Sequence, residues 1–171
     1  MRTIFELIDM RSFASLWFWI VLVVQWSVAS HWVLGVPHGL LTRARRLGGQ
    51  AQRDLEDMAR IKVNRLLYTV HASGLWIAGG TAFLLTVLIL LGFVYRVEFA
   101  QALLCLLLPM VPVGLLSLRT AHRIADGEHR GEALQTRLIR LHMAVQGIGM
   151  VAILATSFWG MYRIMQFGVL G

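Results

Sequence analysis

Four long stretches without a charged residue dominate this chain of 171 residues and limit what it can fold into. They cover residues 12–42, 66–95, 99–118 and 141–162. A helix of about 20 mostly apolar residues is long enough to cross the hydrocarbon core of a bilayer. Because lipid offers no hydrogen-bond partner to the backbone, a spanning segment must be a helix or a strand of a closed barrel.

The pattern within these stretches favours helices. Apolar residues follow one another without the alternation of a barrel strand, as in the run 82–91. Only 15% of the residues are charged, whereas a soluble domain has about a quarter. We therefore expect an all-α membrane protein with four transmembrane helices in two antiparallel hairpins. One domain covers residues 1–171, with spans at about 13–36, 67–94, 99–118 and 141–162.

Lysine and arginine predict the orientation, because they concentrate in cytoplasmic loops. The loop 38–66 carries seven of them and the loop 119–140 carries five, whereas four lie on the other side. We therefore expect a multi-pass protein of the bacterial inner membrane, with both loops in the cytoplasm and both termini in the periplasm. The first span is expected to be retained, because the residues before it carry no net charge and a signal peptide begins with a positive segment.

Both cytoplasmic loops are predicted to extend the spans as helices. Residues 50–95 should form one long helix, with acidic residues in its first turns and basic residues later, as the helix dipole favours. Residues 119–140 should also be helical, with a break at Asp126-Gly127. Pro37 should end the first span and Pro109 should permit a bend in the third. The short turn 95–98 should make the second and third spans antiparallel neighbours.

Three histidines near the cytoplasmic ends of the spans are candidate cofactor ligands. His31 and His71 both lie roughly 7–8 Å inside that boundary, at a helical rise of about 1.5 Å per residue. His142 begins the fourth span. Two such residues on facing helices suit the iron of a b-type haem, a metal or a quinone carbonyl. The alternative is that these rings simply lie at the membrane interface, half in water.

No other pattern points to catalysis, so we expect a protein that is not an enzyme and has no catalytic residue and no metal site. The spans contain no acidic residue, and intramembrane carboxylates are the usual mark of proton relays and ion pathways. Cys105 is the single cysteine and lies within a leucine run, where it is expected to pack as a small apolar residue. A transporter would need to be an oligomer, because four short helices without a buried charge offer little pathway for a substrate.

Polar and small residues within the spans are expected to serve helix packing. Gln25, Gln101 and Gln146 lie deep in spans, and such amides most often form hydrogen bonds between helices. Gly147 and Gly149 begin a line of small residues in the fourth span. Small residues let two helix backbones approach closely.

The net charge of +7 indicates contact with the lipid bilayer and with a membrane or cytoplasmic protein partner. Most arginines border a span, where they lie against anionic headgroups. A nucleic-acid partner is not expected, because no aromatic residues interleave the basic loops. The residues predicted to bind the protein partner are Arg45, Arg46, Arg53, Arg60, Arg123 and Arg130.

Four segments resemble a known protein family. They are Ile8 to Phe13, Ala29 to Pro37, Arg43 to Arg46 and Val97 to Ala102. The chain resembles, over most of its length, a family of small four-span alphaproteobacterial inner-membrane proteins that are often labelled a component of the Suf iron–sulfur assembly complex. A scaffold for iron–sulfur clusters needs several cysteine thiolates, and this chain has one. The resemblance therefore implies a protein that tethers or assists that machinery and does not carry the cluster.

The leading hypothesis is an inner-membrane accessory, tethering or assembly subunit without catalytic activity and without a cofactor. The alternative is a haem b- or quinone-binding membrane anchor for electron transfer that uses His31 and His71. A visible spectrum separates the two hypotheses, because a bound haem gives a Soret band.

Overall fold

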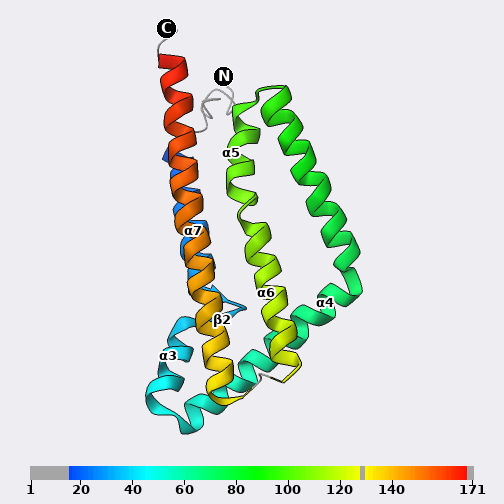
Figure 1. The fold of residues 1–171 in the computed structure, drawn as a ribbon, viewed down its shortest axis with the longest axis vertical. Helices are drawn as coiled ribbons and strands as arrows, with labels where there is room; N and C mark the ends of the chain where they lie inside the picture. Colours follow the sequence, from blue (N-terminus) through cyan, green and yellow to red (C-terminus); the bar gives the residue numbers. More distant parts are fainter. Residues whose placement is uncertain (1–15, 128–129, 169–171) are drawn as a thin grey trace, which may run out of the picture.

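The computed structural model describes residues 16–127 and 130–168, and nearly all of them are helical (Figure 1). Two short strands, β1 (Trp32–Val33) and β2 (Val36–Pro37), form a small antiparallel hairpin. The helices are α2 (Leu16–His31), α3 (His38–Leu47), α4 (Gly49–Ile89) with its π-helical continuation η2 (Leu90–Val94), α5 (Glu98–Leu107), α6 (Met110–Ala125) and α7 (Gly131–Gly168).

Three helical segments among the described residues are long and apolar enough to cross a membrane. They are Gly49–Val94, Glu98–Ala125 and Gly131–Tyr162. The expected all-α fold is thus confirmed, with three described segments that could span a membrane. The apolar helix Leu16–Ser30 is shorter than a full span, and the first residues of the expected span 13–36 lie outside the described part of the chain.

The far end of the expected span 13–36 differs from the prediction, because the helix ends at His31 and the β1–β2 hairpin follows. Leu34 and Gly35 have positive φ angles of 54° and 72°, the backbone that a tight two-residue hairpin turn requires. Val36 precedes Pro37, and the residue before a proline is driven into extended backbone. Helix α2 therefore ends at His31, before the hairpin, and not at Pro37 as the sequence predicted.

Helix α4 confirms the prediction of one long helix over residues 50–95. It begins after Gly48, whose φ of 60° is not helical and separates α4 from α3. It continues through η2 to Val94. Figure 1 shows that α4 is bent: its first part crosses the lower end of the molecule, and its second part rises beside α5. The pair Ser73-Gly74 lies between the buried residues of the first part and those of the second, and Gly/Ser pairs are a common cause of kinks.

The third apolar stretch is interrupted where Pro109 stands. Helix α5 ends at Leu107 and α6 begins at Met110, because proline lacks the N–H that would continue the helical hydrogen bonds. Pro112 falls in the first turn of α6, where a missing N–H leaves no bond unmade. The break at Asp126-Gly127, between α6 and α7, and the short turn between η2 and α5 also match the predictions.

Buried side chains form three clusters at successive levels. The middle cluster joins α2 to α5 and α7, and the upper cluster joins the end of α4 to α5. The lower cluster joins β2, α3, the first part of α4, the end of α6 and the start of α7. Its buried residues are Val36, Leu41, Ala44, Leu55, Ala59, Val63, Ala121, Ile124, Leu134 and Leu138. We call the part of the molecule built around this lower cluster the arginine-rich base.

Candidate functional site

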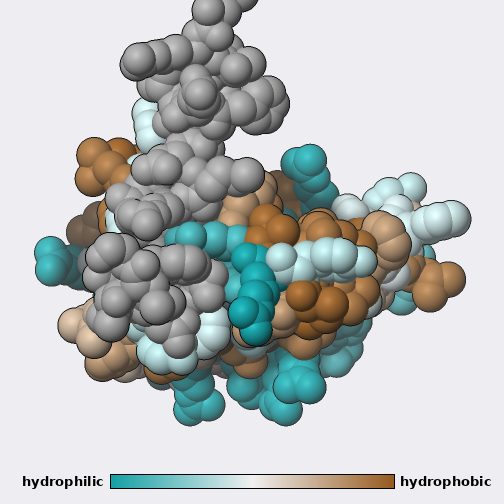
Figure 2. Space-filling model, turned by 90° about the horizontal axis from the view of Figure 1, so that it is seen from above, coloured by the Kyte–Doolittle hydropathy of each residue, from teal (hydrophilic) through white to brown (hydrophobic). Residues whose placement is uncertain are grey.

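The arginine-rich base carries all six arginines that were predicted to bind a partner. Arg45 and Arg46 lie on α3, Arg53 and Arg60 on α4, Arg123 near the end of α6 and Arg130 just before α7. All six are exposed. A view from above, turned from that of Figure 1, shows broad hydrophobic areas, with hydrophilic side chains along its lower edge (Figure 2).

Glu56 holds the two ends of the base together. Its Oε1 accepts a hydrogen bond from the backbone N–H of Gly131 at 2.8 Å and one from Nε2 of Gln52 at 2.7 Å. Nε2 of Gln135 in turn donates to Oε1 of Gln52 at 2.5 Å. A carboxylate at the first residue of α7 satisfies a backbone N–H and lies at the positive end of the helix dipole. These hydrogen bonds join the first part of α4 to the start of α7, and we call the base braced for this reason. The exposed arginines therefore lie on a part of the molecule whose helices are held together.

The sequence placed Glu56 among the acidic residues in the first turns of the helix 50–95 but did not connect it with Gly131, and it did not point to Gln52 or Gln135. A carboxylate is easily recognised as a helix cap when it lies next to the helix start. Glu56 is 75 residues away from Gly131 in the chain, so no local signal connects them.

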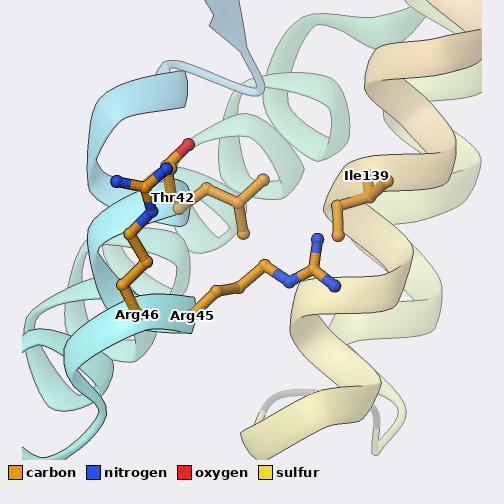
Figure 3. Close-up of a pocket in the computed structure, with 5 residues that line it drawn as sticks. Thr42, Arg45, Arg46 and Ile139 are labelled. Atoms are coloured by element: carbon orange, nitrogen blue, oxygen red, sulfur yellow. The ribbon is translucent and has the colours of Figure 1, made fainter.

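Arg45 and Arg46 line a pocket between α3 and α7 (Figure 3). Its volume is about 420 Å³, and Leu41, Thr42 and Ile139 complete the lining. The Arg45 side chain extends across toward Ile139 on α7, and the Arg46 side chain runs along α3 toward Thr42 (Figure 3). Of the six predicted arginines, the structure brings these two into one pocket.

No acidic side chain in the described part of the chain pairs with the two arginines of this pocket. None of the five lining residues is acidic. Among the described residues, neither the Arg45 nor the Arg46 guanidinium has an ion-pair or hydrogen-bond partner. Arg60, by contrast, lies 3.2 Å from the Asp57 carboxylate. The pocket is therefore a place where an external anion would meet two available guanidinium groups.

The predicted haem ligands lie on helices with different packing partners. His31 ends α2, and its side chain lies outside what the structure describes. His71 is exposed on α4, and His142 is half-buried on α7. The buried cluster that holds α2 contains residues of α5 and α7 and none of α4. In the described part of the chain, no group of three or more His, Cys, Asp or Glu side chains gathers where it could hold a metal ion.

The three glutamines of the charge-free stretches connect helices, as predicted. Nε2 of Gln25 donates to the Leu106 carbonyl at 2.8 Å, where α5 breaks before Pro109. Nε2 of Gln101 donates to the Gly92 carbonyl of η2 at 2.6 Å. Nε2 of Gln146 lies 3.4 Å from the Ser30 hydroxyl. These hydrogen bonds connect α2, α5, η2 and α7 and serve helix packing.

The arrangement of the base suits the binding of anionic groups, because arginine forks match phosphate and carboxylate geometry. A packed core orients the arginines, and two of them face a common pocket.

No family model matches this chain, and no curated protein and no solved structure matches it.

Proposed function

We propose that this protein is a four-span protein of the bacterial inner membrane that anchors a partner at the cytoplasmic face and has no catalytic activity of its own. Loops 38–66 and 119–140 would lie in the cytoplasm and both termini in the periplasm. Helix α2 would form the first span together with residues that precede Leu16. The arrangement in two antiparallel hairpins belongs to the same proposal.

The apolar surface of the second part of α4 supports insertion into a membrane. Residues 75–84 are all exposed, although Leu75, Trp76 and Phe83 are large and apolar. Soluble proteins rarely expose a continuous apolar surface of this kind. Lipid contact removes it from water, and an α-helix satisfies its own backbone there.

The single observation that carries the anchoring role is the braced base with its exposed arginines. Arg53, Arg123 and Arg130 project from an end of the molecule whose interior is packed and whose helices are tied through Glu56. Preorganised positive charge favours encounter with an acidic protein surface. The resemblance described above makes the Suf iron–sulfur assembly complex the first partner to test.

Charge reversal at the base tests this role. The full chain carrying Arg53→Glu, Arg123→Glu and Arg130→Glu is compared with Arg96→Glu, an exposed arginine at the opposite end of the apolar spans. We expect a stoichiometric complex with purified Suf proteins in detergent for the wild type and for Arg96→Glu, and no complex for the triple variant. A complex that forms equally with all three proteins, or with none, contradicts the proposal.

A haem b- or quinone-binding anchor that uses His31 and His71 is the competing function. The packing of α2 on α7 and α5 and the exposure of His71 give it less support than the base gives to anchoring. A Soret band in the purified wild-type protein that is lost in both His31→Ala and His71→Ala would replace the proposed function with this one.

A further inference from the structure

We propose that the pocket between α3 and α7 binds the phosphate of an anionic phospholipid of the phosphatidylglycerol class, taken from the cytoplasmic leaflet. This inference rests on the orientation in the proposed function, but it does not need the protein partner. It assigns Arg45 and Arg46 to lipid and leaves Arg53, Arg123 and Arg130 for the partner.

The chemistry of the lining suits a phosphodiester. Two arginines without partners among the described residues face the pocket, and its lining contains no carboxylate that would repel an anion. A guanidinium presents two parallel N–H donors to two phosphate oxygens. Thr42 adds a hydroxyl group to the same lining.

The position of the pocket, next to the start of an apolar stretch, favours a lipid over a soluble anion. Thr42 is the last residue of the first charge-free stretch, and Ile139 lies two positions before Leu141, which begins the fourth. The pocket thus lies where α7 changes from charged to apolar, and α3, which follows the β1–β2 hairpin, lines it from the other side. Basic pockets between membrane helices on the cytoplasmic side are suited to anionic headgroups at this level.

The apolar part of the lining gives a lipid a second point of contact. Leu41 is buried in the lower cluster, and Ile139 packs against that cluster from α7. Both line the pocket together with the arginines, and Figure 3 shows the Arg45 side chain extending toward Ile139. The volume of about 420 Å³ falls in the range of about 300–1,000 Å³ that is usual for small-ligand sites. It can take the headgroup while the acyl chains leave toward the bilayer.

Binding of dioctanoyl phosphatidylglycerol to the full chain in a zwitterionic detergent tests the proposal. We expect Arg45→Gln/Arg46→Gln to bind it about tenfold more weakly or worse, because the charge-assisted hydrogen bonds to phosphate are lost. Arg53→Gln/Arg123→Gln removes the same charge from the same end outside the pocket, and it should bind within about twofold of the wild type. Equal weakening in both double variants would show diffuse attraction and overturn the site.

Two further probes separate lipid from other occupants. Dioctanoyl phosphatidylcholine should not displace bound dioctanoyl phosphatidylglycerol. Inorganic phosphate, added at the concentration of the phosphatidylglycerol and at equal ionic strength, should not displace it either. Competition by phosphatidylcholine would show a merely apolar groove, and competition by phosphate would show a site for a soluble anion; either result overturns the proposal. A Suf complex lost in Arg45→Gln/Arg46→Gln with unchanged lipid binding would assign the pocket to the protein partner instead.

Arg45→Lys/Arg46→Lys keeps the test valid if the glutamine variant does not fold. Lysine retains the charge near the end of α3 but loses the planar fork. Affinity clearly weaker than that of the wild type supports the site, and affinity equal to that of the wild type argues against guanidinium–phosphate recognition. Because lipid binding needs no partner, failure of the Suf experiment leaves these outcomes unchanged.

Discussion

Gly149 controls how closely α7 approaches α2. A Cβ atom at this position would lie 2.7 Å from Cε3 of Trp26, which is far inside van der Waals contact. Trp26 is buried in the middle cluster and cannot swing away freely. Gly147, on the same helix, has no described atom within 4 Å of the equivalent position. The small-residue line predicted in the fourth span therefore contains one position with a specific steric role.

Gly149→Ala should lower the free energy of unfolding by about 1–3 kcal/mol, because the added methyl group overpacks the α2–α7 contact. Gly147→Ala is the matched control and should leave stability unchanged or slightly higher, since alanine favours a helix more than glycine does. Thermal unfolding of both variants in the same detergent measures the difference. Equal stability of the two variants would contradict this account of Gly149.

Glu56→Ala should destabilise the protein by about 1–2 kcal/mol, because the backbone N–H of Gly131 loses its acceptor at the start of α7. Asp57→Ala is the control: its carboxylate pairs with Arg60 on the exposed surface, and such pairs contribute about 0–1 kcal/mol. Denaturant titration followed by tryptophan fluorescence gives both values. A larger effect at Asp57 than at Glu56 would show that the base is not braced in this way.

Helix α2 is shorter than a full membrane span and is held in place by its contacts with other helices. Its buried residues Phe18, Leu22 and Trp26 recur every four positions and face α5 and α7. Gln25, on a neighbouring face, reaches the Leu106 carbonyl in the last turn of α5. The break before Pro109 makes carbonyls of that turn available, so the interruption of one helix supplies the partner of another.

Gln25→Leu should lower the free energy of unfolding by about 0.6 kcal/mol, the mean found for hydrogen bonds between membrane helices, and by no more than about 1.7 kcal/mol, the largest value found. Gln146→Leu is the matched control, since its longer contact of 3.4 Å to Ser30 is exposed and should contribute less. Unfolding of the two variants in mixed micelles compares the bonds. A greater loss at Gln146 would rule out the α2–α5 bond as the stronger connection.

The whole molecule places the arginine-rich base at one end and the turn between η2 and α5 at the other (Figure 1). In the proposed orientation, Gln50 lies in the cytoplasm and Val97 in the periplasm, and both are exposed. The three described membrane-capable segments connect these two ends. In that orientation each end would be accessible from one side of the membrane only.

Single cysteines at these two positions test the orientation. In a Cys105→Ala background, an impermeant maleimide should label Val97→Cys in intact spheroplasts and Gln50→Cys only after the membrane is permeabilised, since positive loops remain inside. Labelling of Gln50→Cys from outside would reverse the proposed topology. Labelling of both without permeabilisation would contradict membrane spanning by α4.

The candidate site was predictable in its charge but not in its geometry. The sequence groups Arg45, Arg46 and Arg53 in one basic loop, and the structure places all three, exposed, on α3 and the first part of α4. Ile139 enters the pocket from α7, and the bracing of the base by Glu56 depends on Gly131. Such contacts between distant segments leave no local pattern in the sequence, because each depends on how two helices happen to approach.

The sequence by itself determined the helical class, the long helix over 50–95 and the break at Asp126-Gly127, because charge-free length and backbone-restricting residues act locally. Only the tertiary structure decided that α2 packs on α7 and α5, that α4 bends, and that two arginines meet Ile139. In lipid an apolar side chain is equally stable facing the bilayer or a neighbouring helix. Hydrophobic pattern alone therefore cannot select the partners, and shape complementarity such as that of Gly149 and Trp26 selects them instead.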